Sequence, residues 1–170
     1  MELILKGNKI NRLPKEIGRL HKLTILDLGD NLISELPEEI GELHNLLEMH
    51  FPSNQIKEIP KEIAGLHSLI LFYLGDNQIK ELPKEIGQLQ NLHLINLMNN
   101  QITELPKEIC QLQNLDTLYL SHNQITELPK EFCQLHNLLR LNIKFNSKSE
   151  ITRNIVESMI EQMPKLRAIY

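Results

Sequence analysis

The chain has 170 residues and a net charge of −4 at neutral pH, with charges of both signs spread along its length. No basic stripe is present that could displace the counterions of a nucleic acid, so we expect no nucleic-acid partner. The N-terminal stretch lacks the pattern of a signal peptide, and no segment approaches the ~18 apolar residues of a membrane-spanning helix. We therefore expect no membrane insertion and, by default, a cytoplasmic location.

A period of 23 residues organises the chain. Two residue types keep this spacing without a slip, namely prolines at Pro14, Pro37, Pro60, Pro83, Pro106 and Pro129, and asparagines at Asn8, Asn31, Asn54, Asn77, Asn100, Asn123 and Asn146. Such self-similarity is typical of stacked repeats, each of which buries its apolar face against its neighbours. The sequence therefore predicts about seven repeats rather than a globule with one central core.

Each repeat contains the same series of local signals. Apolar residues two apart, such as Leu26 and Leu28, have the period of a strand with one face inward, and we expect these strands to stack in parallel. An asparagine follows three residues later, where a buried side chain can pair with backbone groups of adjacent turns. After the proline, Ile86 and Leu89 are three apart, which predicts a short helical segment with one apolar face.

The repeat pattern ends after Asn146. Ser147 and Glu150 have the spacing of a capping box, and an apolar stripe runs from Ile151 to Met163, so we expect a longer helix that Pro164 stops. An eighth strand is expected to begin at Leu166. The predicted organisation is thus a repeat array over residues 1–146, with an incomplete first repeat, followed by a capping helix and terminal strand over 147–170.

The first coil has no such cover at the N-terminus. Leu3 and Leu5 begin a strand almost at once, which leaves one apolar side and one strand edge exposed. Open strand edges are sites at which another chain can pair. We therefore expect either a homodimer through this edge, which would make the chain a self-associating structural module, or a missing upstream segment.

Residues that flank the strand leucines should point outward, away from the core. In the central repeats many of these residues are apolar or aromatic, while Glu48, Arg140 and Lys144 supply a polar rim. An apolar centre with a polar rim is typical of interaction sites, and tyrosine is a favoured anchor. Ordinary strand propensity would also favour such residues. The predicted partner-binding residues are His50, Leu71, Tyr73, Leu94, Asn96, Met98, Thr117 and Tyr119.

Histidines and cysteines offer competing interpretations. Cys110 and Cys133 occupy one slot of adjacent repeats, where free thiols would act as small apolar side chains, although a disulfide is conceivable if the Cα atoms lie within ~4.4–6.8 Å. Stacked histidines could bind Zn²⁺ or Ni²⁺, but the same slot holds glutamine in two repeats, and the cysteines lack a fourth ligand. We expect no metal and no cofactor. The histidines in question are His21, His44, His67 and His136.

No motif of an enzyme is present. The chain lacks a glycine-rich phosphate loop, a nucleophile elbow and an HExxH pattern. Both cysteines also lie in structural slots of the repeat. We therefore expect no catalytic residues and no enzymatic activity.

The repeating unit L-x-x-L-x-L-x-x-N-x-[LI]-x-x-L-P-x-x-I-x-x-L resembles the leucine-rich repeats of Ras-suppressor and Scribble-type scaffolds. Repeats such as NQIKELPKEIGQLQNL and NQITELPKEICQLQNL are especially similar to the short repeat proteins of leptospiral bacteria. This resemblance implies an α/β solenoid, a curved right-handed superhelix with a parallel sheet on the concave face and short α or 3₁₀ segments on the convex face. It also implies a protein partner, including a host protein in a bacterial setting, and it allows secretion or surface exposure.

Overall fold

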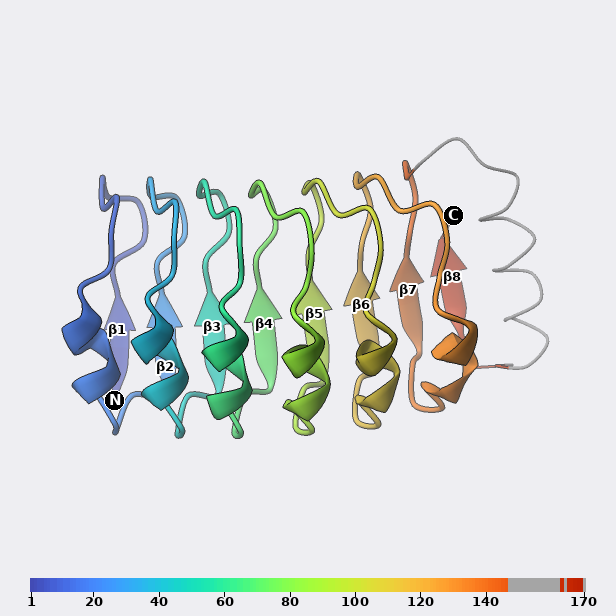
Figure 1. Cartoon of the computed structure of the whole chain (residues 1–170), viewed down its shortest axis with the longest axis horizontal. Helices are drawn as coiled ribbons and strands as arrows, with labels where there is room; N and C mark the ends of the chain where they lie inside the picture. The colour runs from blue at the N-terminus through green and yellow to red at the C-terminus, as the bar shows by residue number, and fades with distance from the viewer. Residues whose placement is uncertain (147–162, 164, 170) are drawn as a thin grey trace.

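The computed structural model of the chain describes residues 1–146, 163 and 165–169, and it has the expected solenoid architecture. Each repeat forms one coil, and the coils stack side by side from the N-terminus to the C-terminus (Figure 1). The coils that begin with β1 to β6 each consist of a short strand, a turn and a short helix. The predicted fold class is therefore confirmed.

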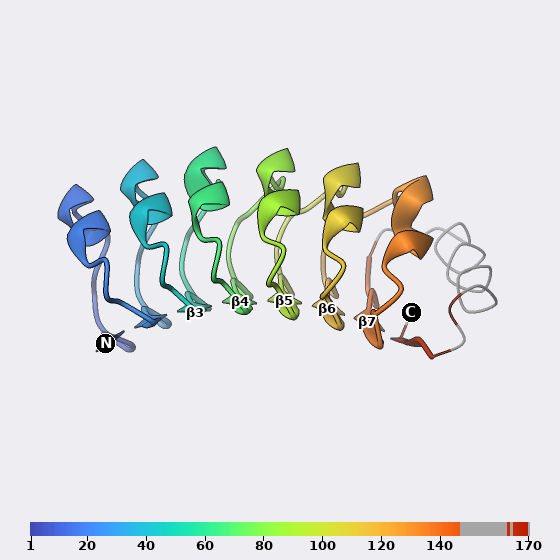
Figure 2. The same cartoon turned by 90° about the horizontal axis from the view of Figure 1, so that it is seen from below.

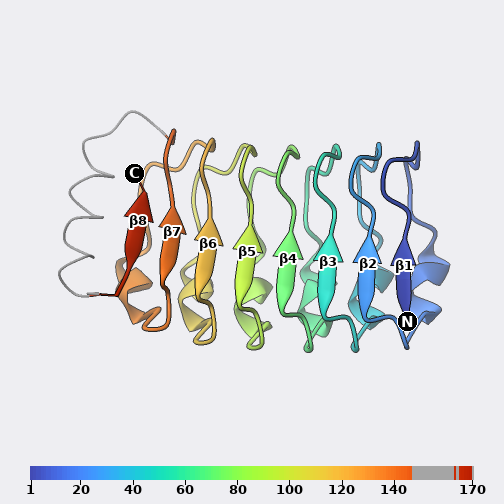
Figure 3. The same cartoon turned by 180° about the vertical axis from the view of Figure 1, so that it is seen from behind.

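The strands form one parallel sheet of eight strands in sequential order. Residues 23 apart are register partners, for example Leu26 and Met49, or Phe72 and Ile95. Figure 3 shows this sheet face-on. The strands are β1 (Glu2–Ile4), β2 (Ile25–Asp27), β3 (Glu48–His50), β4 (Leu71–Tyr73), β5 (Leu94–Asn96), β6 (Thr117–Tyr119), β7 (Arg140–Asn142) and β8 (Arg167–Ile169).

The helices are short 3₁₀ segments on the outer side of the arc, and the strands lie along its inner, concave side (Figure 2). Each helix follows a proline in extended conformation, as at Pro83 with φ −66° and ψ 145°. Proline suits this position because its ring presets φ and the first turn of a helix has no use for its N–H. The helices are η1 (Lys15–Arg19), η2 (Glu38–Glu42), η3 (Lys61–Gly65), η4 (Lys84–Gln88), η5 (Lys107–Gln111) and η6 (Lys130–Gln134).

The core runs lengthwise through the solenoid between the strands and the helices. Every complete coil contributes a ring of buried leucine and isoleucine side chains; in the second coil Leu26, Leu28, Ile33, Ile40 and Leu43 are all 0% exposed. These side chains contact the rings of the preceding and following coils. The stability of each repeat therefore depends on the interface with its neighbours.

A ladder of asparagine side chains connects the coils. Asn77 accepts a hydrogen bond from the backbone N–H of Ile56 (2.9 Å) and donates to the carbonyl oxygens of Phe51 (3.0 Å) and Leu74 (3.1 Å). Ile56 and Phe51 belong to the preceding repeat, whereas Leu74 belongs to the same repeat as Asn77. The predicted role is confirmed, because equivalent bonds are made by Asn31, Asn54, Asn100, Asn123 and Asn146.

The turns after β2 to β7 each contain one non-glycine residue in the left-handed region, with φ between 53° and 58° at Asp30, Ser53, Asp76, Asn99, His122 and Phe145. Short polar residues tolerate this conformation because their side chains bond locally. Phe145 is the exception, since a bulky side chain rarely adopts positive φ. The sequence did not reveal this strained position.

A tightly packed slot lies on the convex side. A Cβ atom built on Gly41 would clash with the backbone carbonyl oxygen of Glu62 in the next repeat. Cys110 and Cys133 fill the equivalent slot later in the array as free thiols, the first buried and the second half-buried. Burial, with a smaller contribution from the Glu131 carboxylate, raises the pKa of Cys110 to about 12.

The two ends of the chain are described in part. The helix expected after Asn146 falls on residues outside the described part of the chain, whereas β8 pairs in parallel with β7. At the other end, β1 pairs with β2 alone among the described strands. A homodimer through β1 stays a prediction. In the described residues, no helix is long and apolar enough to cross a membrane.

The asparagine ladder predicts a large effect for Asn77→Leu. The substitution would leave the buried N–H of Ile56 without its acceptor, at about 1–3 kcal/mol for an unpaired group. It would also remove one of two asparagine donors from the carbonyls of Phe51 and Leu74, which keep Asn54 and Asn100. We expect the free energy of unfolding to fall by about 2 kcal/mol or more, measured by urea unfolding followed by circular dichroism.

Asn45→Leu is the matched control for this variant. Asn45 also donates between repeats, to the carbonyl of His21 at 2.8 Å, but it is exposed. Water can replace its hydrogen bond, so a loss below about 1 kcal/mol is expected. Equal losses for the two variants would contradict a special role of the buried ladder.

The two thiols should differ in reactivity. Only the thiolate reacts with iodoacetamide, and a pKa of about 12 keeps Cys110 protonated at pH 8. We expect native protein at pH 8 to be alkylated at Cys133 well before Cys110, as measured by peptide mass spectrometry, with both labelled alike in concentrated urea. Equal native rates would show that the environment of Cys110 does not protect it.

Candidate partner-binding surface

The outer surface of the sheet is formed by the first and third residue of each strand. In β4, Leu71 and Tyr73 are half-exposed while Phe72 between them is 1% exposed. The same alternation places the predicted residues of β3 and β5 on this surface, on the concave side seen in Figure 3. The fold thus separates positions that serve the core from positions that face outward.

Tyr73 lies at the centre of an aromatic and acidic cluster. The ring of His50 stacks on the ring of Tyr73 with centroids 4.7 Å apart and planes 18° from parallel. His50 Nε2 lies 2.9 Å from Glu48 Oε2, which fixes the imidazole. Burial, then Glu48, then Tyr119 raise the pKa of the Tyr73 hydroxyl. The hydroxyl is protonated at neutral pH and is a hydrogen-bond donor on this surface.

The neighbouring strands extend this surface toward the C-terminus. Leu94, Asn96, Met98 and Tyr119 are all half-buried, and Asn96 Oδ1 accepts the backbone N–H of Met98 at 3.1 Å. We call the outward residues the concave stripe, which comprises His50, Leu71, Tyr73, Leu94, Asn96, Met98 and Tyr119.

Thr117 differs from the other predicted residues because it is only 1% exposed. Its hydroxyl donates to Asp116 Oδ1 at 2.6 Å, and its register partners are the longer Leu94 and Arg140. A short side chain between two long ones offers little surface. The sequence correctly placed Thr117 at an outward strand position, but it could not show that the neighbouring side chains and the hydrogen bond would bury it.

Two further clusters border the concave stripe and were missed from sequence. His93 Nδ1 lies 3.2 Å from Asp116 Oδ2 at one edge. At the other edge, the ring of Phe145 stacks on His122 at 4.5 Å, and Lys144 Nζ lies 5.3 Å from the centre of the Phe145 ring. Both His93 and Asp116, and His122 and Phe145, are 23 residues apart. Aligning the repeats and comparing residues at equivalent positions of adjacent repeats could therefore have identified both pairs.

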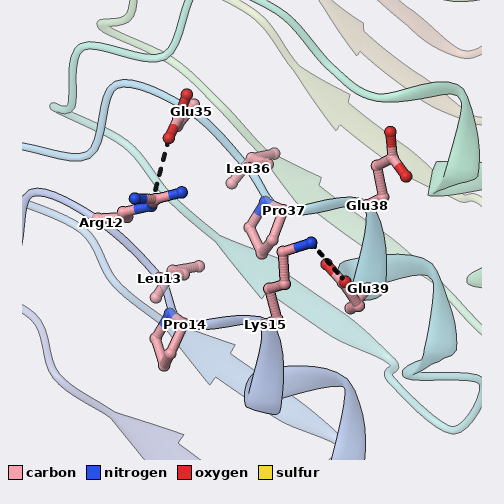
Figure 4. Close-up of a pocket in the computed structure, with 9 residues that line it drawn as sticks. All are labelled: Arg12, Leu13, Pro14, Lys15, Glu35, Leu36, Pro37, Glu38 and Glu39. Carbon is pink, nitrogen blue, oxygen red and sulfur yellow. Dashed lines mark ion pairs between the residues drawn. The ribbon is translucent and has the colours of Figure 1, made fainter.

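A surface depression between the first two coils has a different character. Figure 4 shows it beside Pro14 and Pro37, bordered by two ion pairs. Arg12 with Glu35 and Lys15 with Glu39 both have nitrogen-to-oxygen distances of 3.4 Å. The first pair is mostly exposed on both sides, and exposed pairs contribute little energy. This depression is part of the solvated face of the repeats and offers no buried polar group to orient a small ligand.

The histidine row on the convex side forms a partial stack. The rings of His44 and His67 have centroids 6.0 Å apart, and His44 Nδ1 lies 2.9 Å from the carbonyl oxygen of Gly65. That contact occupies one of the two ring nitrogens of His44. Among the described residues, no three His, Cys, Asp or Glu side chains are grouped to hold a metal ion.

Comparison with protein families identifies the repeats. Residues 84–169 match the leucine-rich repeat region family, and residues 21–79 match the leucine rich repeat family. A search of curated proteins gave no match.

Solved structures with the same fold come from bacteria and plants. A leucine-rich repeat protein of Leptospira interrogans is 40% identical with a TM-score of 0.73, covering 99% of this chain and 48% of its own. An internalin of Listeria monocytogenes is 22% identical with a TM-score of 0.81. The match covers 98% of this chain and 46% of the internalin, and it shows the fold alone. The Arabidopsis receptor kinase HAESA, solved with the peptide hormone IDA and the co-receptor SERK1, is 26% identical with a TM-score of 0.77. The match covers 85% of this chain and 25% of HAESA.

The chain therefore spans about half the length of the two bacterial structures that it matches. Solenoids of this kind are typical protein–protein interaction modules, in which stacked repeats present an extended concave surface. On the repeat pattern, the architecture and the family matches, the chain belongs to the leucine-rich repeat family.

Proposed function

We propose that the chain is a protein-recognition module that binds its partner on the concave stripe and acts by binding alone. The observation that carries this proposal is the cluster at Tyr73, where a half-exposed tyrosine packs against His50 and lies close to Glu48 and Tyr119. Tyrosine offers a large contact area and a hydroxyl that can donate, at a small cost in side-chain entropy. These properties make it a favoured anchor of protein interfaces.

The fold does not require aromatic residues at these positions. Tyr73 and Tyr119 occupy the third position of their strands, where β2, β5 and β7 have Asp27, Asn96 and Asn142. All of these strands pair in the same register, so a polar residue serves the sheet equally well. This variation favours recognition over strand propensity as the reason for the two tyrosines.

The similar structures support a protein or peptide partner. HAESA was solved with a peptide hormone and a co-receptor, so a solenoid of related architecture holds protein ligands in that case. The likeness to the Leptospira interrogans protein makes a host protein a candidate partner. Under that proposal the chain would act in a secreted or surface-exposed form.

The proposal is tested by the double variant Tyr73→Ala and Tyr119→Ala. Binders would first be selected on the whole chain from a random peptide library displayed on phage. If the concave stripe is the preferred surface, most selected peptides should bind the double variant about tenfold more weakly or worse, because truncating a central anchor typically costs ~1–2 kcal/mol or more. Affinities would be measured by biolayer interferometry with synthetic peptides.

The double variant His44→Ala and His67→Ala provides the matched control, since it truncates two ring side chains on the convex side. Its affinities should equal those of the unchanged chain. Selected peptides that ignore the tyrosine variant but lose affinity for the histidine variant would move the binding surface to the convex side and overturn the proposal.

A further inference from the structure

The charged residues on the outer surface of the sheet are separated by sign. At the first and third strand positions, β1 to β3 contain only acidic charged residues, β4 to β6 contain no charged residue, and β7 and β8 contain only basic ones. Lys6, next to β1, is paired with Asp30 at 3.4 Å. Lys144 follows β7 and adds to the basic end. The acidic residues are Glu2, Asp27 and Glu48, and the basic residues of the strands are Arg140 and Arg167.

The basic end has an unfavourable arrangement within the sheet. Arg140 and Arg167 are register partners on adjacent parallel strands, so like charges face outward about 4.8 Å apart at their backbones. Both side chains are exposed. Neither makes an ion pair within the described residues 1–146 and 165–169, whereas Glu48 at the acidic end contacts His50. A carboxylate placed against the two side chains would relieve this repulsion, and the planar guanidinium favours such a partner.

We propose that the outer surface of the sheet, with the concave stripe at its centre, binds an extended segment of a partner protein that is basic at one end, apolar in the middle and acidic at the other. The basic end lies over β1 to β3, the apolar middle over Leu71, Tyr73 and Leu94, and the acidic end over Arg140 and Arg167. This inference rests on the proposed function and specifies the chemistry and orientation of its partner. Nucleic acid does not fit this surface, because the acidic end would repel its phosphates.

The spacing of the strands sets the length of this segment. Parallel strands lie about 4.8 Å apart, so Glu48 on β3 and Arg140 on β7 are separated by about 19 Å along the sheet. An extended chain advances about 3.3 Å for each residue, so about six residues connect the basic and acidic ends of the partner. The central residues of that segment cross the two tyrosines.

The inference is tested with fluorescein-labelled peptides and the whole chain. The first peptide has two lysines at one end, two glutamates at the other and six uncharged residues with two leucines between them. A second peptide has the same composition with its lysines and glutamates alternating, and two more carry lysines only or glutamates only. Binding would be followed by fluorescence anisotropy in low and moderate salt. We expect the first peptide to bind about tenfold more tightly than the second, with the difference reduced by salt.

Charge reversal of each end supplies the decisive comparison. Glu2→Lys with Glu48→Lys should remove the preference for the first peptide and create one for the glutamate peptide, while Arg140→Glu with Arg167→Glu should create one for the lysine peptide. All four changes together should restore the preference for the first peptide, which would then bind in the opposite direction. Circular dichroism would verify the fold of each variant.

Two outcomes would overturn the inference. In one, the unchanged chain treats the first two peptides alike, including the case in which it binds neither. In the other, the glutamate peptide binds it most tightly, which would reduce the arginine pair to a simple anion site. Neither outcome bears on the selected binders and the tyrosine variant, so the proposed function would stand or fall separately.

Discussion

The rest of the structure depends on the hydrogen bonds that the asparagine ladder makes between coils. Each buried side chain, such as Asn77, satisfies a carbonyl and an N–H of the preceding repeat and a carbonyl of its own. The turn after the strand would otherwise bury these groups unpaired. Because one amide serves two coils, the turns can stack at strand spacing, and the leucines beneath them form a continuous core.

Most of the fold could be predicted from the sequence because the constraints recur in every repeat. Strand leucines, the ladder asparagine and the helix-starting proline each have one physical task, and the 23-residue period exposes all three. Phe145 could not be predicted to adopt positive φ, since the tendency of its side chain opposes it. There the conformation imposed by the stack prevails over local preference.

The sequence predicted which residues form the candidate surface, but not the contacts that their side chains make. The alternation of the strands identified the outward positions, including Tyr73. The stacking of His50 on Tyr73 depends on the side chains of two adjacent repeats, and Thr117 is covered by longer register partners in the repeats on either side. The contact of His50 with Glu48 and the bond of Thr117 to Asp116 arise within one repeat, from the rotamers of neighbouring side chains. The repeat pattern gives which residues point outward, but not these side-chain conformations.

The parallel register of the sheet also has a mechanical consequence. The strands stack along the long axis of the solenoid, so a force applied between its two ends pulls adjacent strands apart perpendicular to their length (Figure 1). The hydrogen bonds between two strands and the bonds of one asparagine would then bear the load before those of the next coil. Under tension such an array would lengthen in steps of one coil, while the remaining coils keep their fold.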